Sequence, residues 1–155
     1  MRVPIEKLSN NAHIWIFGIS PSLDEQQSAH LQRTVDGFLE NWAAHGVPIT
    51  AAAEVREGSF LVVAADERSD KSGCSIDRMF GTLRKLEGEL GVQILDSTRV
   101  FYREGENVRA IDRTKFRTAA TPDTSVFDVT AERLGDVRQG AWERRAAESW
   151  HSQLL

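Results

Sequence analysis

The stretch FLVVAA, residues 60–65, is apolar at six consecutive positions. Because successive side chains of a strand point to opposite faces, this run predicts a strand that is buried on both faces, in the middle of a sheet. The stretch IWIFGI, residues 14–19, is also apolar on both faces and rich in β-branched and aromatic residues, which predicts a second central strand. Both faces of such a sheet must be covered by other parts of the chain or by another molecule.

Two amphipathic helices are predicted next to these strands. Ser22 and Glu25 have the spacing of a capping box, and an apolar stripe over residues 31–42 continues from it as a helix. A second stripe predicts a helix over residues 75–90, with Gly91 as its C-terminal stop.

The remaining strands complete a recognisable order. Alternating apolar residues predict a strand over 49–55, followed by a hairpin connection. Further strand signals are the alternation at 92–94 and the apolar residues at 100–102, with a turn before a possible short strand at 108–111. The order strand, helix, strand, strand, helix, strand predicts an α+β fold with a ferredoxin-like βαββαβ core over residues 13–111 and sheet order 4-1-3-2. We expect the C-terminal extension, residues 112–155, to cover the second sheet face, with a second copy of the chain as the other candidate.

Composition limits the classes of function. A chain of 155 residues is the size of one domain, and its formal net charge of −4 argues against a general nucleic-acid or anionic-membrane binder. The single cysteine and the spacing of the four histidines predict no zinc site, and no cofactor motif is present. Without an apolar run of membrane-spanning length or a leader-like N-terminus, the sequence predicts a cytoplasmic protein.

A candidate site follows from the predicted topology. We expect strands 14–19 and 60–65 to be parallel and adjacent, so that the loops 18–25 and 65–77 meet where both lead into helix N-termini. Unpaired N–H groups and helix dipoles at such ends bind anions. The predicted ligand-binding residues are Gly18, Ser20, Ser22, Lys71, Ser72, Gly73, Ser75, Asp77 and Arg78. Serines and glycines also precede helices as ordinary caps, so a purely structural role stays open.

Cys74 is the candidate catalytic residue. At the start of the second helix the dipole would favour its thiolate, as a nucleophile or a redox-sensitive thiol requires. The topology places His13 and His45 at the opposite edge of the sheet, which leaves His151 as the candidate base. Free cysteines are more often small packing residues, so the sequence does not decide whether the protein is an enzyme.

Several short stretches together resemble a known family. IWIFGIS, WAAHGVPI, FLVVAADE, SGCSID, TSVFD and SWH resemble a family of small bacterial proteins of about this length, often labelled "ABC transporter ATPase". The resemblance covers most of the chain, and SGCSID is its most specific element. The label implies ATP hydrolysis, but the chain contains no GxxxxGK[ST] motif to hold nucleotide phosphates, which argues against a P-loop ATPase.

The sequence thus favours a module that binds a small anion or the acidic group of a partner protein. A cysteine-dependent enzyme or thiol switch is the second hypothesis. A homodimer that uses the second sheet face or an edge strand is the third.

Overall fold

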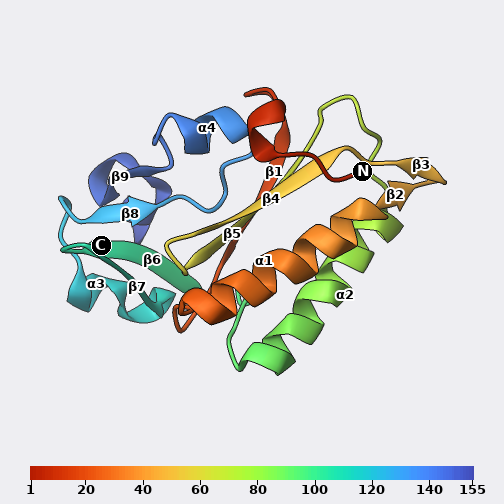
Figure 1. The fold of residues 1–155 in the computed structure, drawn as a ribbon. Coiled ribbons are helices and arrows are strands. Elements are labelled where there is room, and N and C mark those ends of the chain that lie inside the picture. The colour runs from red at the N-terminus through yellow and green to blue at the C-terminus, as the bar shows by residue number, and fades with distance from the viewer.

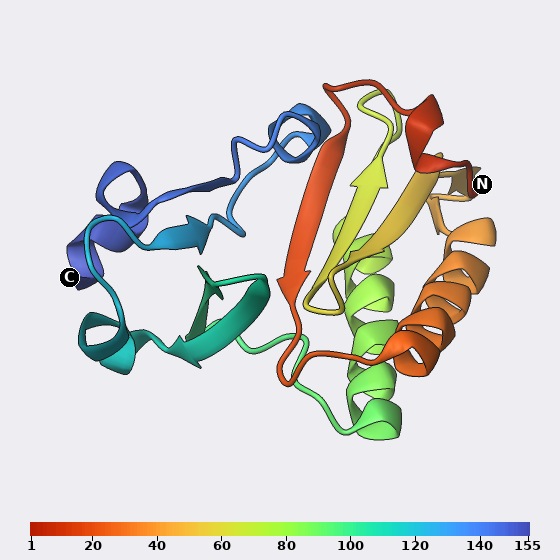
Figure 2. The same ribbon diagram turned by 60° about the vertical axis from the view of Figure 1, so that its left-hand side comes forward.

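The computed structural model describes residues 1–155, and Figures 1 and 2 show the fold in two views. The first part of the chain contains a short 3-10 helix, two long helices and the strands around them: η1 (Ile5–Lys7), β1 (His13–Gly18), α1 (Glu25–Glu40), β2 (Ala43–Ala44), β3 (Val47–Pro48), β4 (Ala51–Arg56), β5 (Phe60–Ala65) and α2 (Gly73–Leu90). The second part consists of shorter elements: β6 (Arg99–Glu104), β7 (Asn107–Asp112), η2 (Arg113–Lys115), α3 (Phe116–Ala119), β8 (Ser125–Phe127), α4 (Leu134–Arg138), β9 (Glu143–Arg145), η3 (Ala146–Glu148) and η4 (Trp150–Leu154).

The strands form two main sheets and one small hairpin. The first sheet has the order β1-β5-β4, the second has the order β7-β6-β8-β9, and β2 pairs with β3. Every strand pair within these sheets is antiparallel. The predicted mixed α+β class is confirmed, and β5, the FLVVAA stretch, is the central strand of the first sheet.

The fourth strand of the predicted order 4-1-3-2 is not where we expected it. Instead of pairing with β1, β6 lies in the second sheet between β7 and β8. The hairpin turn at Gly105 pairs all of β6 with β7 along one edge, and β8 pairs with the other edge at Tyr102, opposite Val126, so β6 belongs to the second sheet. A ferredoxin-like four-stranded sheet is therefore not formed, and the second sheet takes strands from both sides of the boundary predicted at residue 112.

The expected parallel pairing of the first and third predicted strands is also wrong. β1 and β5 are antiparallel, with His13 opposite Ala65 and Gly18 opposite Phe60. The connections explain this direction: the crossover through α1 returns the chain parallel to β1 as β4, and the turn at Glu57 and Gly58 then reverses it into β5. A strand inserted between β1 and β4 in this way runs opposite to both.

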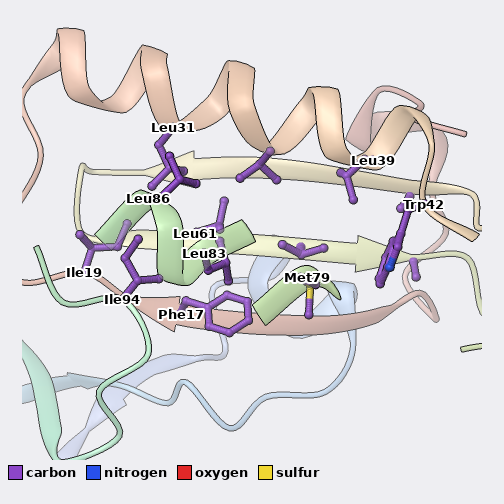
Figure 3. Close-up of a cluster of buried hydrophobic side chains, with 14 of the residues drawn as sticks. Phe17, Ile19, Leu31, Leu39, Trp42, Leu61, Met79, Leu83, Leu86 and Ile94 are labelled. Carbon is purple, nitrogen blue, oxygen red and sulfur yellow. The ribbon is translucent and has the colours of Figure 1, made fainter. Parts of the chain in front are cut away.

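Helices α1 and α2 cover one face of the first sheet (Figure 2). Their apolar stripes meet the sheet in a cluster of 18 buried residues that includes Leu31, Leu39, Leu61, Leu83 and Leu86 (Figure 3). The two helices run in opposite directions, because the end of α1 lies beside the start of α2, where the Trp42 indole N–H donates to the carbonyl of Ser75 over 2.7 Å.

Both long helices begin at a capping box. Asp24 and Gln27 form the box of α1, so the cap predicted at Ser22 and Glu25 is displaced by two residues. Ser72 caps α2 and Ser75 returns the bond, so α2 begins before the predicted Ser75. Gly91 ends α2 in the left-handed conformation, as predicted.

The other face of the first sheet packs against the second part of the chain. Phe60, on β5, is the centre of this layer: its ring centroid lies 5.2 Å from that of Phe101, 4.8 Å from that of Phe127 and 4.8 Å from that of Trp142. Leu134 of α4 belongs to the same buried cluster. The first sheet thus lies between a helical layer and a layer built from β6, β8, β9 and α4 (Figure 2).

An arginine joins the two sheets at one end. Arg103 on β6 donates to Glu143 on β9 over 2.7 Å and to Glu57 in the β4–β5 turn over 3.0 Å. The guanidinium of Arg103 lowers the pKa of Glu143, and Ser125 adds a second hydrogen bond to the same carboxylate. Arg103 and Glu143 are half-buried, so their pair is better ordered than an exposed surface ion pair, whereas Glu57 is exposed.

The two sheets approach closely at Gly18, because a Cβ placed there would overlap the ring of Phe101. We predict that Gly18→Ala lowers the free energy of unfolding by about 1–3 kcal/mol through overpacking, measured by urea denaturation. Gly37→Ala is the control, because nothing lies within 4 Å of a Cβ at Gly37 and the position is inside α1. It should stabilise the protein by about 0.5–1 kcal/mol. Equal effects of the two substitutions would contradict the close approach at Gly18.

Candidate functional site

The two loops predicted to share a pocket lie at opposite ends of the first sheet. Ser20 exchanges two backbone hydrogen bonds with Gln93, of 3.0 and 2.8 Å, just beyond the C-terminal end of α2. Ser72 and Ser75 begin the same helix, and its 18 residues span about 27 Å at 1.5 Å per residue. The antiparallel direction of β1 and β5 is the cause, and the predicted pocket between two helix N-termini does not form.

The residues predicted around the start of α2 mostly hold their own loop. Ser72 and Ser75 bond to each other in the capping box, and Ser75 is fully buried. Lys71 donates its Nζ to the carbonyls of Ser69, over 2.8 Å, and Asp66, over 3.3 Å. These are the contacts of an ordinary helix cap and loop, the structural role that the sequence left open.

The other predicted residues of this helix are on the surface. Gly73 and Asp77 are exposed, and Arg78 donates to the carbonyl of Ala43 over 3.2 Å. Cys74 is exposed and makes no hydrogen bond. His151, the candidate base, is buried in the second part of the chain, beside Phe116, and Figures 1 and 2 show the C-terminal end of the chain far from the start of α2.

The predicted residues after β1 divide between two places. The hydroxyls of Ser22 and Ser59 lie 2.8 Å apart and tie the start of the α1 loop to the β4–β5 turn. Gly18, alone among the nine predicted ligand residues, borders a cavity that the sequence did not reveal.

This cavity, of about 490 Å³, lies beside the end of β1, between α2 and the second part of the chain. Its volume is within the usual range for small-molecule sites. The apolar part of its wall is contributed by Ile16, Phe17, Phe80, Ile94, Leu95, Phe101, Val129 and Trp150. The polar part is contributed by Gly18, Arg84, Asp96, Ser97, Arg99, Arg113 and Thr130. We call it the β1 cavity.

Positive charge predominates on this wall, with three arginines against one carboxylate. The ion pairs of Arg99 with Asp96, at 3.7 Å, and with Asp112, at 3.8 Å, are too long for hydrogen bonds. Arg113 donates to the carbonyl of Ser97 over 3.1 Å, and Arg84 is exposed and belongs to no ion pair. The guanidinium groups thus keep hydrogen-bonding capacity for an anion in the cavity.

Two buried donors beside the β1 cavity have no partner within the protein. They are Nε of Arg99 and Nε1 of Trp150, and both side chains line the cavity. An unsatisfied buried donor costs about 1–3 kcal/mol, and groups of this kind are rare in folded proteins. From the sequence, Trp150 is predicted to be a packing residue, with an aromatic ligand surface as the alternative, and no local pattern distinguishes Arg99 from the other arginines.

The side chains behind Trp150 hold its ring in place. The Trp150 ring is stacked on His151 at a centroid distance of 4.0 Å, and Arg113 covers it with its guanidinium 5.2 Å from the ring centroid. His151 is buried and shares a 2.7 Å hydrogen bond with the Ser149 hydroxyl. Burial lowers the pKa of His151 to about 4, with a smaller contribution from Arg113 in the same direction and an opposing one from Asp128. At neutral pH this imidazole is therefore uncharged.

Two further properties concern metals and membranes. No three histidine, cysteine or acidic side chains gather in a way that could hold a metal ion. None of the helices combines the length and the apolar character that crossing a bilayer requires.

Comparisons with known proteins give no family for this chain. No family model matches it, and no match was found among curated proteins or solved structures. The resemblance to the small bacterial family therefore stays a prediction from the sequence.

The buried His151 makes stability depend on pH. Its pKa is about 4 in the folded protein and 6.5 in the reference state, so the unfolded chain binds a proton more readily between these values. The contribution of His151 to the free energy of unfolding is fully present above pH 6.5. It is lost as the pH drops toward 4, and the loss is about 3 kcal/mol for this group alone. His151→Gln should therefore reduce the loss of stability between pH 7 and pH 4, measured by urea denaturation at each pH.

The wild type and His151→Gln contain the same carboxylates. The difference between their pH-dependent losses of stability therefore reports on the His151 imidazole alone. His45→Asn, on an exposed turn with a φ of 53°, is the control and should keep the wild-type slope. If His151→Gln also kept the wild-type slope, the inference that this imidazole is buried uncharged would be wrong.

Proposed function

We propose that the protein is a binding module for a small organic anion, and that the β1 cavity is its site. The observation that carries the proposal is that Arg99 and Trp150, which both line a cavity with a largely apolar wall, each have a buried side-chain donor without a hydrogen-bond partner. A ligand with an acidic group and an apolar body would satisfy the donors and cover the aromatic side chains at once.

The geometry suggests how such a ligand would be held. Arg99 begins β6 and Arg113 follows β7, both at the open end of this hairpin, and Arg84 comes from α2, so an anion between them would receive charge-assisted hydrogen bonds from separate elements. The rings of Phe17, Phe80 and Phe101 form part of the apolar wall for the body of the ligand. The Arg99 guanidinium, with only long ion pairs, has little to give up when the ligand binds.

This proposal keeps the class of function predicted from the sequence and moves its site. The predicted anion site required the loop before α1 and the loop before α2 to meet. In the structure these two loops lie at opposite ends of α2. The second hypothesis, chemistry at Cys74, gains no support from its surroundings, because the thiol is exposed and makes no hydrogen bond to a base. The homodimer, the cytoplasmic location and the bacterial family remain predictions.

Removing either unpartnered donor should weaken anion binding without unfolding the protein. Trp150→Phe keeps an aromatic ring and loses the indole N–H, and Arg99→Lys keeps the charge and loses Nε. For benzoate, indoleacetate and phenyl phosphate, measured by isothermal titration calorimetry, we expect at least one probe to bind the wild type. Each substitution should raise its Kd by about tenfold.

The control for this experiment is Arg117→Lys, because Arg117 is exposed on α3 and does not border the cavity. It should leave Kd unchanged. Without ligand, Trp150→Phe should keep its free energy of unfolding within about 1 kcal/mol of the wild type, since it removes an unsatisfied polar group. Binding of none of the anions, or equal binding by all four proteins, would overturn the proposal.

A further inference from the structure

The outer edge of β1 is unpaired where it borders the β1 cavity. In an antiparallel strand the backbone groups of every second residue point to the same side. The N–H of Ile19 bonds to Ser59, on the β5 side, whereas the N–H groups of Ile14 and Ser20 bond outward, to Glu132 and Gln93. The backbone groups of residues 16 and 18 therefore point outward as well.

No hydrogen bond occupies these outward groups of Ile16 and Gly18. β1 pairs with β5 alone, and neither residue has another backbone or side-chain partner. Both residues line the β1 cavity. The residues that line the cavity thus include two whose outward N–H and C=O groups, in strand geometry, have no hydrogen-bond partner.

The chain itself closes both ends of this edge and leaves the middle open. An isolated bridge joins His13 to Arg133 at one end, and another joins Ser20 to Gln93 at the other. Between Ile14 and Gly18 the open edge is about 13 Å long, at 3.3 Å per residue. β6 does not fill it, because β6 lies in the second sheet between β7 and β8. The open edge is the position that a fourth strand would take beside β1.

We propose that the ligand of the β1 cavity is an extended peptide segment with a carboxylate, which adds to the outer edge of β1 as a short fourth strand. This rests on the proposed function, since it names the class of anion that the same site binds. Main-chain hydrogen bonds to Ile16 and Gly18 supply the pairing, as in other cases of strand addition. The cluster of Arg84, Arg99 and Arg113 at the same cavity selects the carboxylate by charge complementarity.

The wall suits a peptide in a second respect. Side chains of an added strand point alternately to the two faces of the sheet. Beside Ile16 they would meet the layer of Phe101, and beside Phe17 they would meet that of Phe80 on α2. An extended segment with small or β-branched apolar side chains next to its carboxylate fits this arrangement.

The test uses the full-length, nitrogen-15-labelled protein and follows the amide resonances of Ile16 and Gly18. The probes are a pentapeptide of valine and serine with a free C-terminal carboxylate, its amidated form with a central glutamate, an amidated form without glutamate, and benzoate. We expect the first or the second probe to shift both amides, which also tells a terminal carboxylate from an acidic side chain. The amidated peptide without glutamate, which has no carboxylate, should bind about tenfold more weakly than the carboxylate peptides.

Backbone methylation of the peptide provides the matched control. N-methylation at one set of alternate residues removes the N–H groups that face β1 and should raise Kd by about tenfold or more. Methylation at the other set, whose N–H groups face away, should change Kd by about twofold at most. Arg99→Lys should weaken the carboxylate peptides and leave the uncharged one unaffected.

The outcomes separate the two proposals. If benzoate binds in an Arg99-dependent way and no peptide shifts the amides of Ile16 and Gly18, strand addition is wrong and small-anion binding stands. If peptides bind but both methylated sets behave alike, pairing to β1 is also wrong. If no probe binds, both proposals fall.

Discussion

The structure depends on the burial of β5 from both sides. Residues 60–65 have relative exposures of 0% throughout, so every side chain of this strand is removed from water. Burying a phenylalanine, leucine or valine side chain, as at residues 60–63, contributes about 1.5–3 kcal/mol, but one layer can cover only one sheet face. The chain must therefore provide two layers, and it does so with α1 and α2 on one side and the second sheet with α4 on the other.

The way in which the second layer is built creates the β1 cavity. In a ferredoxin-like fold the fourth strand, which is β6 in this chain, would pair with the outer edge of β1. Here β6 turns away into its own sheet and covers the face of the first sheet through Phe101, while the edge of β1 stays open. The unpartnered donors of Arg99 and Trp150 are located at the same place. Groups that lower stability in the free protein are expected at sites whose function uses them.

The elements were largely predictable because their signals are local. The apolar run over 60–65, the stripe over 75–90 and the glycine at 91 each specify an element without reference to the rest of the chain. The antiparallel direction of β1 and β5 was also within reach of the sequence, since a helical crossover followed by a hairpin implies it. Our expectation of a parallel pair was an error about the topology, and the predicted pocket was lost with it.

The site was less predictable, because its residues come from six separate segments of the chain. The alternation in residues 99–104 is the same whether that strand pairs with β1 or with β8, so the sequence pattern does not choose between them. Arg99 and Trp150 look like any surface arginine and any packing tryptophan. Their importance arises only from the contacts they lack in the folded structure.

Amide hydrogen exchange along β1 in the ligand-free protein distinguishes a strand that is paired on one side and open beside the cavity from a strand that is paired on both sides. We expect alternation: slow exchange at residues 15, 17 and 19, which bond toward β5 and the turn before it, and fast exchange at residues 16 and 18. Equally strong protection at all five amides would mean that the outer edge is already paired and that β1 offers no open edge to a ligand.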